Sequence, residues 1–264
     1  MGAESSLEIE SGHLTVLPRA VAFDLDDTLA ESFQPPKPEM MARIRALLEI
    51  IPVAIITGAG FDRIKAHVLS QMPETSRDLY LFPNSSSQCF ICVDGEWRME
   101  YSVTLSPEER EQIVSALQKC SEELPIIKNT EHFGQQIVDR EAQIAYTVVG
   151  LDAPPEIKKQ WDPDGEKRRT IVEALKRNLD DFDILIGGAS TIDITRRDIN
   201  KARGILWLSE RLGFPPTDML YIGDALYEGG NDAVVFPTGV QTLSVTGPAD
   251  TAKIIDELLR ISAI

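Results

Sequence analysis

The stretch Val21-Ala-Phe-Asp24-Leu-Asp26-Asp27-Thr28-Leu29 joins a short apolar strand to a cluster of carboxylates. Residues 20–23 predict a buried strand, and Asp24 and Asp26 follow at its carboxyl end. Because side chains alternate between the faces of a strand, we expect Asp24 and Asp26 on the same side. Two carboxylates held together repel each other unless a cation lies between them. The stretch therefore predicts a site for Mg²⁺-assisted phosphoryl chemistry.

Strands and helices alternate from this motif onward and again near the end of the chain. Apolar runs predict strands at 20–23, 52–56 and 79–82, separated by helices at 38–50 and from about 61 to 71. This β-α-β-α-β order predicts a parallel sheet covered by helices. The alternation returns after residue 200, with expected helices at 201–212 and 248–260 and strands at 219–222 and 243–245.

The middle of the chain has a different pattern. Asp94-Gly95 predicts a hairpin, and Ser106-Pro107-Glu108-Glu109 predicts a capped helix that runs to about residue 123. Asp162 can cap a second helix over about 163–179, and strands are expected at 136–139, 143–149, 184–186 and 191–194. We therefore predict an α/β core made of residues 1–86 and 189–264, interrupted by an inserted α+β domain over residues 87–188.

Charge and hydropathy narrow the possible partners. The net charge of −16 argues against nucleic acid and against an anionic membrane, because both require a basic surface. No apolar run reaches the ~20 residues of a membrane span, and the acidic residues 1–10 do not resemble a signal peptide. We expect a cytoplasmic protein.

The three cysteines do not make a disulfide framework. Cys89 and Cys92 have the spacing of a metal site, but no second pair follows and the residues between them are apolar. We interpret both as structural residues of a strand.

Polar residues follow three of the predicted core strands, where ligands of parallel sheets bind. These are Asp24 with Asp26, then Thr57, then Asp224, and Lys201 begins a helix between the last two. Transfer through an aspartyl phosphate needs such a set. One carboxylate attacks phosphorus, a second carboxyl protonates the leaving oxygen, and a hydroxyl and an ammonium hold the phosphoryl oxygens.

In order and spacing, these motifs resemble those of the haloacid dehalogenase (HAD) superfamily of phosphohydrolases, which have a Rossmann-like core. The resemblance rests on Asp24-Leu-Asp26-Asp27-Thr28, Thr57-Gly58, Lys201, and Gly223-Asp224 through Asp232. It implies that Asp24 is the nucleophile and a Mg²⁺ ligand. It implies that Asp26 is the general acid and base, with its main-chain carbonyl on the metal.

The same resemblance assigns the remaining core residues. Thr57, Gly58 and Lys201 would bind the transferring phosphoryl group. Asp224 would be a further metal ligand, and Asp232 would support the metal directly or through water.

The segment from Gly223 to Asp232 is similar to that of eukaryotic-type phosphomannomutases and their type IIB relatives. Gln143-Ile144, Trp161-Asp162-Pro163-Asp164 and Gly187-Gly188 resemble segments of the cap domain in that subgroup. The resemblance implies a C2-type cap that closes over the core with the substrate between them. It also raises the possibility of a homodimer formed through the cap.

The cap departs from the mutase pattern at the second phosphate. Arg140, Thr191 and Asp193 fall where three phosphate-binding groups are expected, but Leu151 and Lys158 fall where further arginines are expected. Leucine cannot hold a phosphate, and lysine replaces a bidentate fork with a point charge. A mutase must bind both ends of a bisphosphate, whereas a hydrolase needs one phosphate site. Asp27 also stands where phosphomannomutases usually carry glycine.

Plainer readings of single residues stay open. Thr57 could cap the helix that follows it, and Lys201 could be an exposed helix lysine. Arg140, Thr191 and Asp193 could be ordinary polar residues of a sheet.

Three functions follow from these observations. We favour a Mg²⁺-dependent phosphatase that hydrolyses a small phosphorylated metabolite, above all a sugar phosphate, through an aspartyl phosphate. The alternative is a hexose phosphate mutase of the phosphomannomutase kind. The third is a non-catalytic phosphoacceptor or metal-binding module that signals through Asp24.

Overall fold

The structure, a computed structural model, describes residues 9–10, 13–14, 16–73 and 76–263. It divides the chain into two compact units. The core unit contains residues 1–101, 201–227 and 232–264, and the inserted unit contains residues 102–200 with 228–231. Most of the acidic N-terminal segment 1–10 lies outside the described residues.

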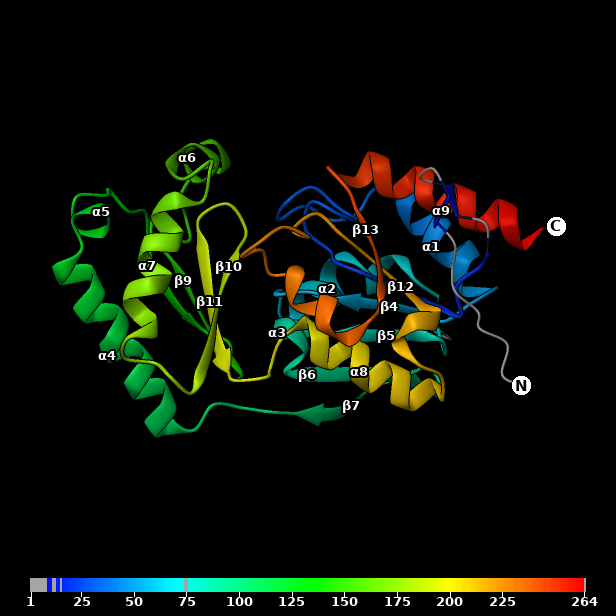
Figure 1. The fold of residues 1–264 in the computed structure, drawn as a ribbon, viewed down its shortest axis with the longest axis horizontal. Helices are drawn as coiled ribbons and strands as arrows, with labels where there is room; N and C mark the ends of the chain where they lie inside the picture. The colour runs from blue at the N-terminus through cyan, green and yellow to red at the C-terminus, as the bar shows by residue number, and fades with distance from the viewer. Residues whose placement is uncertain (1–8, 11–12, 15, 74–75, 264) are drawn as a thin grey trace. The chain divides into compact units, whose positions relative to one another are not determined.

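A seven-stranded sheet forms the centre of the core unit, in the order β13-β12-β3-β4-β5-β6-β7 (Figure 1). Strands β13 to β5 run parallel, and β6 is antiparallel to β5. The predicted α/β core with a parallel sheet is confirmed. The bounds of these strands are β3 (Ala20–Phe23), β4 (Val53–Ile56), β5 (Leu79–Phe82), β6 (Gln88–Val93), β7 (Glu96–Ser102), β12 (Met219–Gly223) and β13 (Gln241–Ser244). A separate pair, β1 (Ile9–Glu10) and β2 (His13–Leu14), is antiparallel.

Helices pack on both faces of this sheet, so its central strands are apolar on both sides and fully buried. Helices α1 (Pro38–Leu48), α2 (Phe61–His67) and α9 (Pro248–Ser262) share one hydrophobic cluster with the sheet. Helix α8 (Lys201–Leu212) belongs to the cluster on the other face. The described residues of the core unit also include the 3₁₀ segments η1 (Leu69–Gln71), η2 (Pro216–Asp218) and η3 (Ala233–Thr238).

The turn α3 (Pro83–Ser86), which follows β5, is left-handed. Asn84, Ser85 and Ser86 have φ values of 48°, 55° and 67°. Non-glycine residues rarely adopt this conformation, and each one costs about 1–2 kcal/mol. The amides of Asn84 and Ser85 donate to the carbonyls of Ala59 and Thr57, at 2.9 and 2.8 Å. These two bonds hold the strained turn against the loop that carries Thr57.

The inserted unit is an antiparallel sheet in the order β10-β11-β9-β8 with helices on one face (Figure 1). Residues Ile144, Tyr146, Ile192 and Ile194 share a hydrophobic cluster with these helices. This confirms the predicted α+β fold of the inserted unit. The bounds are β8 (Ile137–Asp139), β9 (Gln143–Thr147), β10 (Phe182–Gly187), β11 (Thr191–Arg196), α4 (Pro107–Glu123), α5 (Pro125–Lys128), α6 (Pro155–Trp161) and α7 (Glu166–Lys176).

The boundaries of the insertion differ from the prediction. We expected it over residues 87–188, but the structure divides the chain near residues 101 and 200. The first boundary moves because the hairpin β6–β7 extends the core sheet through the pairing of β6 with β5. The second boundary moves because β11 pairs with β10 and β9 of the inserted sheet. The sequence correctly predicts the hairpin but does not reveal the sheet that it joins.

The two predicted caps in the inserted unit behave differently. The capping box at the start of α4 is confirmed, with reciprocal bonds between Ser106 and Glu109. Helix α7 begins at Glu166, later than predicted, since Gly165 before it is left-handed. Asp162 still caps this helix, because its carboxylate accepts from the amides of Lys167 and Arg168 at 2.9 and 3.0 Å.

None of the helices in the described part of the chain combines the length and the apolar character needed to cross a lipid bilayer.

Candidate active site

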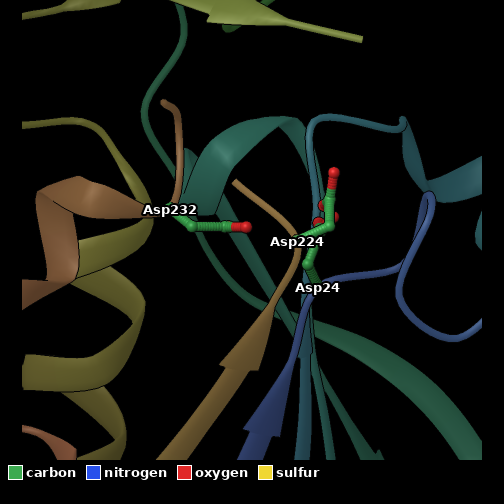
Figure 2. A group of neighbouring side chains, drawn as sticks. All are labelled: Asp24, Asp224 and Asp232. Atoms are coloured by element: carbon green, nitrogen blue, oxygen red, sulfur yellow. The ribbon is translucent and has the colours of Figure 1, made fainter. Parts of the chain in front are cut away.

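Three of the predicted site residues follow adjacent strands of the core sheet. Asp24 follows β3, Thr57 follows β4 and Asp224 follows β12, and these strands are neighbours in the order β12-β3-β4. Their carboxyl ends therefore meet at one edge of the sheet. Figure 2 shows Asp24 and Asp224 at these strand ends, with Asp232 pointing toward them.

Lys201 is the first residue of α8 and is fully buried beside the carboxylates. Its Nζ donates to Oδ1 of Asp24 and to Oδ1 of Asp232, each at 2.6 Å. Burial alone would lower the pKa of Lys201, but the charges of Asp232 and Asp24 outweigh it and raise the pKa above its usual value. Lys201 is therefore a permanent cation of the site, and the reading of it as an exposed helix residue is wrong.

Carboxylate oxygens of Asp24, Asp224 and Asp232 lie within 4.8 Å of one another. Burial raises the pKa of Asp24, and the charges of Asp232 and Asp224 raise it further against the opposing effect of Lys201. Burial and Asp232 raise the pKa of Asp224 to about 6. When all three are ionised, Lys201 leaves two negative charges without a counterion. A hard divalent cation with oxygen ligands fits this charge and this donor set.

Asp232 is held by three donors in the base of the site. Its Oδ1 accepts from Lys201 and from the hydroxyl of Tyr221, and its Oδ2 accepts from the amide of Ala225 at 2.9 Å. Through these bonds, Asp232 can position Lys201 and the backbone of residues 223–225. Tyr221 was not among the residues predicted from the sequence. The one available signal was a tyrosine inside the apolar strand β12.

Gly223 provides the space for Asp232. A Cβ at position 223 would lie 2.4 Å from Oδ2 of Asp232 and 2.9 Å from the Tyr221 ring. We expect Gly223→Ala to displace Asp232 and Lys201 and to lower kcat by about 10- to 100-fold, because small displacements of positioned groups are costly. Steady-state kinetics would measure this. Gly188→Ala, where the added Cβ meets no atom within 4 Å and φ lies outside the left-handed region, is the control for the change of residue type.

Thr57 is buried and oriented by its own loop. Its Oγ1 accepts from the amide of Ala59 at 3.1 Å, so the hydroxyl hydrogen remains for a phosphoryl oxygen. Its amide donates to Phe82 O at 3.0 Å, and Gly58 follows it in the loop between β4 and α2. Thr57 is four residues from the start of α2 and is not its cap, which is Gly60.

The carboxylate of Asp26 has a partner that the sequence analysis did not predict. We expected a cation between Asp24 and Asp26, but Arg63 of α2 donates to both oxygens of Asp26, at 2.8 and 2.5 Å. The two aspartates therefore have separate counterions. The metal-ligand group formed by Asp24, Asp224 and Asp232 does not include the Asp26 carboxylate.

The structure explains why Asp27 can stand where glycine is usual. Its φ is 53°, in the left-handed region, which aspartate tolerates better than most residues. Its carboxylate accepts from the amide of Ser32 at 3.1 Å and from the Ser32 hydroxyl. These bonds close the loop after Asp26. Thr28 lies beside it and donates to Oδ1 of Asp224 at 3.4 Å.

The three cap residues lie at successive positions along one face of the sheet. Thr191 and Asp193 share a face of β11, and Gln143 Nε2 donates to Oδ1 of Asp193 at 2.6 Å. Arg140 lies just beyond Asp139 of β8, whereas Thr191 pairs with Thr147 at the other end of β9. That separation is four residue positions, or about 13 Å along the strand.

The positions where further arginines were expected carry no guanidinium. Leu151 is 45% exposed, and Lys158 Nζ donates to the main-chain carbonyl of Leu151 at 2.7 Å.

The cysteines lie in apolar surroundings. Cys89 and Cys92 are buried in β6 and, three residues apart on a strand, face opposite sides of the sheet. Burial raises the pKa of Cys89 to about 12. This arrangement does not suit a metal site shared by the two thiols.

Known proteins resemble this chain over most of its length. A sequence model of the family "Eukaryotic phosphomannomutase" matches residues 40–261. A phosphomannomutase from Spinacia oleracea is 25% identical over 246 residues, which cover 89% of this chain and 94% of that protein. One from Schizosaccharomyces pombe is 25% identical, covering 91% of this chain and 94% of that protein.

Solved structures share the fold at lower identity. A mutant form of the IMP-nucleotidase of Plasmodium falciparum, bound to IMP, has a TM-score of 0.69 at 20% identity, covering 92% of this chain and 68% of that one. The C-terminal domain of trehalose-6-phosphate phosphatase from C. albicans has a TM-score of 0.63 at 15% identity, covering 92% and 93%.

The match to the family spans most of the chain, and the two solved structures share its fold. The chain therefore belongs to the eukaryotic phosphomannomutase family of the HAD superfamily of phosphotransferases and phosphatases.

Proposed function

We propose that this protein is a Mg²⁺-dependent phosphatase that hydrolyses a small phosphomonoester, in particular a sugar phosphate, through an aspartyl phosphate. The observation that carries this proposal is the buried bond from Lys201 to Oδ1 of Asp24. In the described part of the chain, Oδ2 of Asp24 receives no side-chain hydrogen bond, so it is the oxygen available to attack phosphorus.

The reaction has two balanced steps. Oδ2 of Asp24 attacks phosphorus, the bond from phosphorus to the leaving oxygen breaks, and that oxygen takes a proton from the Asp26 carboxyl. Water then attacks the phosphorus of the aspartyl phosphate and gives a proton to Asp26, while the bond to Asp24 breaks and inorganic phosphate leaves.

The other residues bind the phosphoryl group. The Thr57 hydroxyl and the Lys201 ammonium hold its oxygens while charge moves onto them. Asp24, Asp224 and the main-chain carbonyl of Asp26 would hold Mg²⁺, with support from Asp232, and the ion would neutralise charge on the phosphoryl oxygens.

The inserted unit favours hydrolysis over mutase activity. A mutase needs strong cationic binding of a second phosphate, yet Leu151 and Lys158 offer no arginine fork. Arg168, a buried arginine near the hairpin β10–β11, is bound to Asp162 and to the carbonyls of Gly187 and Gly188. It is therefore not available to a substrate.

A phosphomannomutase-like hexose phosphate mutase is the second candidate. It is favoured by the names of relatives that match about nine tenths of the chain. In this case the phosphoryl group on Asp24 returns to a sugar hydroxyl instead of water. It predicts interconversion of hexose 6-phosphate and hexose 1-phosphate that a hexose bisphosphate stimulates.

The test is release of inorganic phosphate from a panel of sugar phosphates and nucleoside monophosphates. We expect release from one or a few compounds with Mg²⁺, its loss with EDTA, its return on adding Mg²⁺, and none with Asp24→Asn protein. Isomerisation with no release would replace the phosphatase by the mutase. A stable phosphorylated Asp24 with neither activity would support a phosphoacceptor module.

A further inference from the structure

Asp26, the proposed acid and base, is held by three hydrogen bonds that leave one side of its carboxylate open. Arg63 Nη2 donates to Oδ1 at 2.5 Å and Arg63 Nη1 donates to Oδ2 at 2.8 Å. The amide of Phe33 donates to Oδ1 at 2.9 Å.

The count of lone pairs distinguishes the two oxygens. An ionised carboxylate offers about four acceptor positions. Arg63 and Phe33 fill both positions on Oδ1 and one on Oδ2. In the described part of the chain, the remaining position on Oδ2 has no protein donor, so Oδ2 is the oxygen that can exchange a proton with a leaving group or with water.

Arg63 is itself fixed in place. It lies on α2, directly after the loop that carries Thr57, and its guanidinium lies over the Phe33 ring at 5.2 Å from the ring centre. Phe33 has a φ of 64°, a conformation that turns its amide toward Asp26. The planar fork of arginine sets the plane of the carboxylate, which a lysine could not do.

The ion pair between Arg63 and Asp26 contributes little to the folding stability of the protein. The side chains of Arg63 and Asp26 are 22% and 26% exposed, and ion pairs open to solvent contribute little to folding. The effect of the fork is therefore on the orientation of Asp26.

We propose that Arg63 is a positioning residue that orients Asp26, so that Oδ2 carries the proton transferred in both steps. This inference rests on the proposed function, because it takes Asp26 as the acid and base. It assigns Arg63 a role in proton transfer and not in binding the substrate.

The experiment compares Arg63→Met in two backgrounds, wild type and Asp26→Ala. General acid–base catalysis contributes about 10²- to 10⁴-fold, and we expect the loss of orientation to remove about 10- to 100-fold of this in kcat, with KM unchanged. In the Asp26→Ala background, Arg63→Met should change kcat by less than about threefold, since the residue it orients is absent. Arg63→Lys should restore only part of the activity.

Arg43 provides the matched control. It forms the same two-pronged bond to an aspartate, Asp256, at 2.8 and 2.9 Å between helices α1 and α9. Arg43→Met removes an equivalent pair in the same unit and should leave kcat unchanged. Thermal melting of every variant checks folding, and Arg63→Gln, which keeps a polar side chain, serves if Arg63→Met is unstable.

A second readout separates the two chemical steps. With p-nitrophenyl phosphate, the leaving group departs without protonation. Arg63→Met should therefore release p-nitrophenolate in a rapid burst close to the enzyme concentration, followed by slow turnover limited by hydrolysis of the aspartyl phosphate.

The outcomes are distinguishable. A raised KM with normal kcat would show that Arg63 binds substrate. An equal loss of kcat in both backgrounds would show that Arg63 acts on a group other than Asp26. Either result, or an unchanged kcat in the Arg63→Met variant, would overturn the proposal. If wild-type protein releases no phosphate while Asp24→Asn behaves identically, the proposed function has failed independently of Arg63.

Discussion

Asp24→Asn is expected to abolish phosphate release while leaving the fold intact. The amide cannot attack phosphorus, and removal of a nucleophile that acts with an acid–base partner lowers turnover on the order of 10⁴-fold or more. We expect the melting temperature to stay close to that of the wild type. Lys201 keeps its bond to Asp232, and one of three mutually repelling carboxylates is removed. Phosphate release and thermal melting measure the two effects.

Asp27→Asn is the matched control for this change. Asp27 lies three residues further on, and its carboxylate binds Ser32 instead of the metal-ligand group. Asparagine also tolerates its left-handed conformation, so this variant should keep most of the activity. Equal activity in Asp24→Asn and wild type would refute a mechanism through an aspartyl phosphate.

Arg168→Met is expected to destabilise the inserted unit by about 3–5 kcal/mol, because it leaves a buried carboxylate without its counterion. Arg168 Nε donates to Oδ2 of Asp162 at 2.8 Å, and the two side chains are 8% and 0% exposed. Arg168 also donates to the carbonyls of Gly187 and Gly188. It thereby ties the hairpin β10–β11 to the start of α7. Hydrogen exchange of the β9–β11 amides, followed by mass spectrometry, would measure the change.

Arg169→Met is the control in the same helix. Arg169 is paired with Glu166, and both side chains are exposed, so its removal should cost less than about 1 kcal/mol. Equal protection in the two variants would show that the buried pair does not stabilise the unit.

The pair formed by Arg168 and Asp162 also makes the stability of the inserted unit depend on pH in the acid range. Burial would raise the pKa of Asp162, but bonds from Arg168 and from the amides of Lys167 and Arg168 outweigh it and lower the pKa below its usual value. Because the pKa of Asp162 is lower in the folded than in the unfolded state, its ionised carboxylate stabilises the inserted unit above about pH 4. This stabilisation is lost as the pH falls further and passes the folded-state pKa of Asp162. Hydrogen exchange measured at decreasing pH would locate this loss below pH 4 in the wild type.

The sequence determined the elements of the core unit and the residues that converge at its edge. Strands β3, β4 and β5 and helix α8 have the predicted positions within a few residues, because apolar runs and helix signals are local properties. Asp24, Thr57 and Asp224 could be placed together because parallel strands end at one edge of a sheet. That rule needs the order of elements and no knowledge of side-chain directions.

The tertiary structure decided which groups neutralise one another. Arg63 and Tyr221 were missed because nothing near them in sequence shows that their tips reach Asp26 and Asp232, which lie 37 and 11 residues away. For the same reason, the distance along the sheet between Arg140 and Thr191 depends on the register of β8, β9 and β11, which the sequence does not reveal.

The boundary of the insertion also depended on a long-range contact. The hairpin β6–β7 has the same local sequence signals whichever unit it joins, and only its pairing with β5 assigns it to the core. Backbone conformation follows from local sequence preferences, whereas ion pairs and the pairing of strands depend on residues brought together by the whole fold. The sequence therefore determined the acidic motif, and the tertiary structure decided how its charges are balanced.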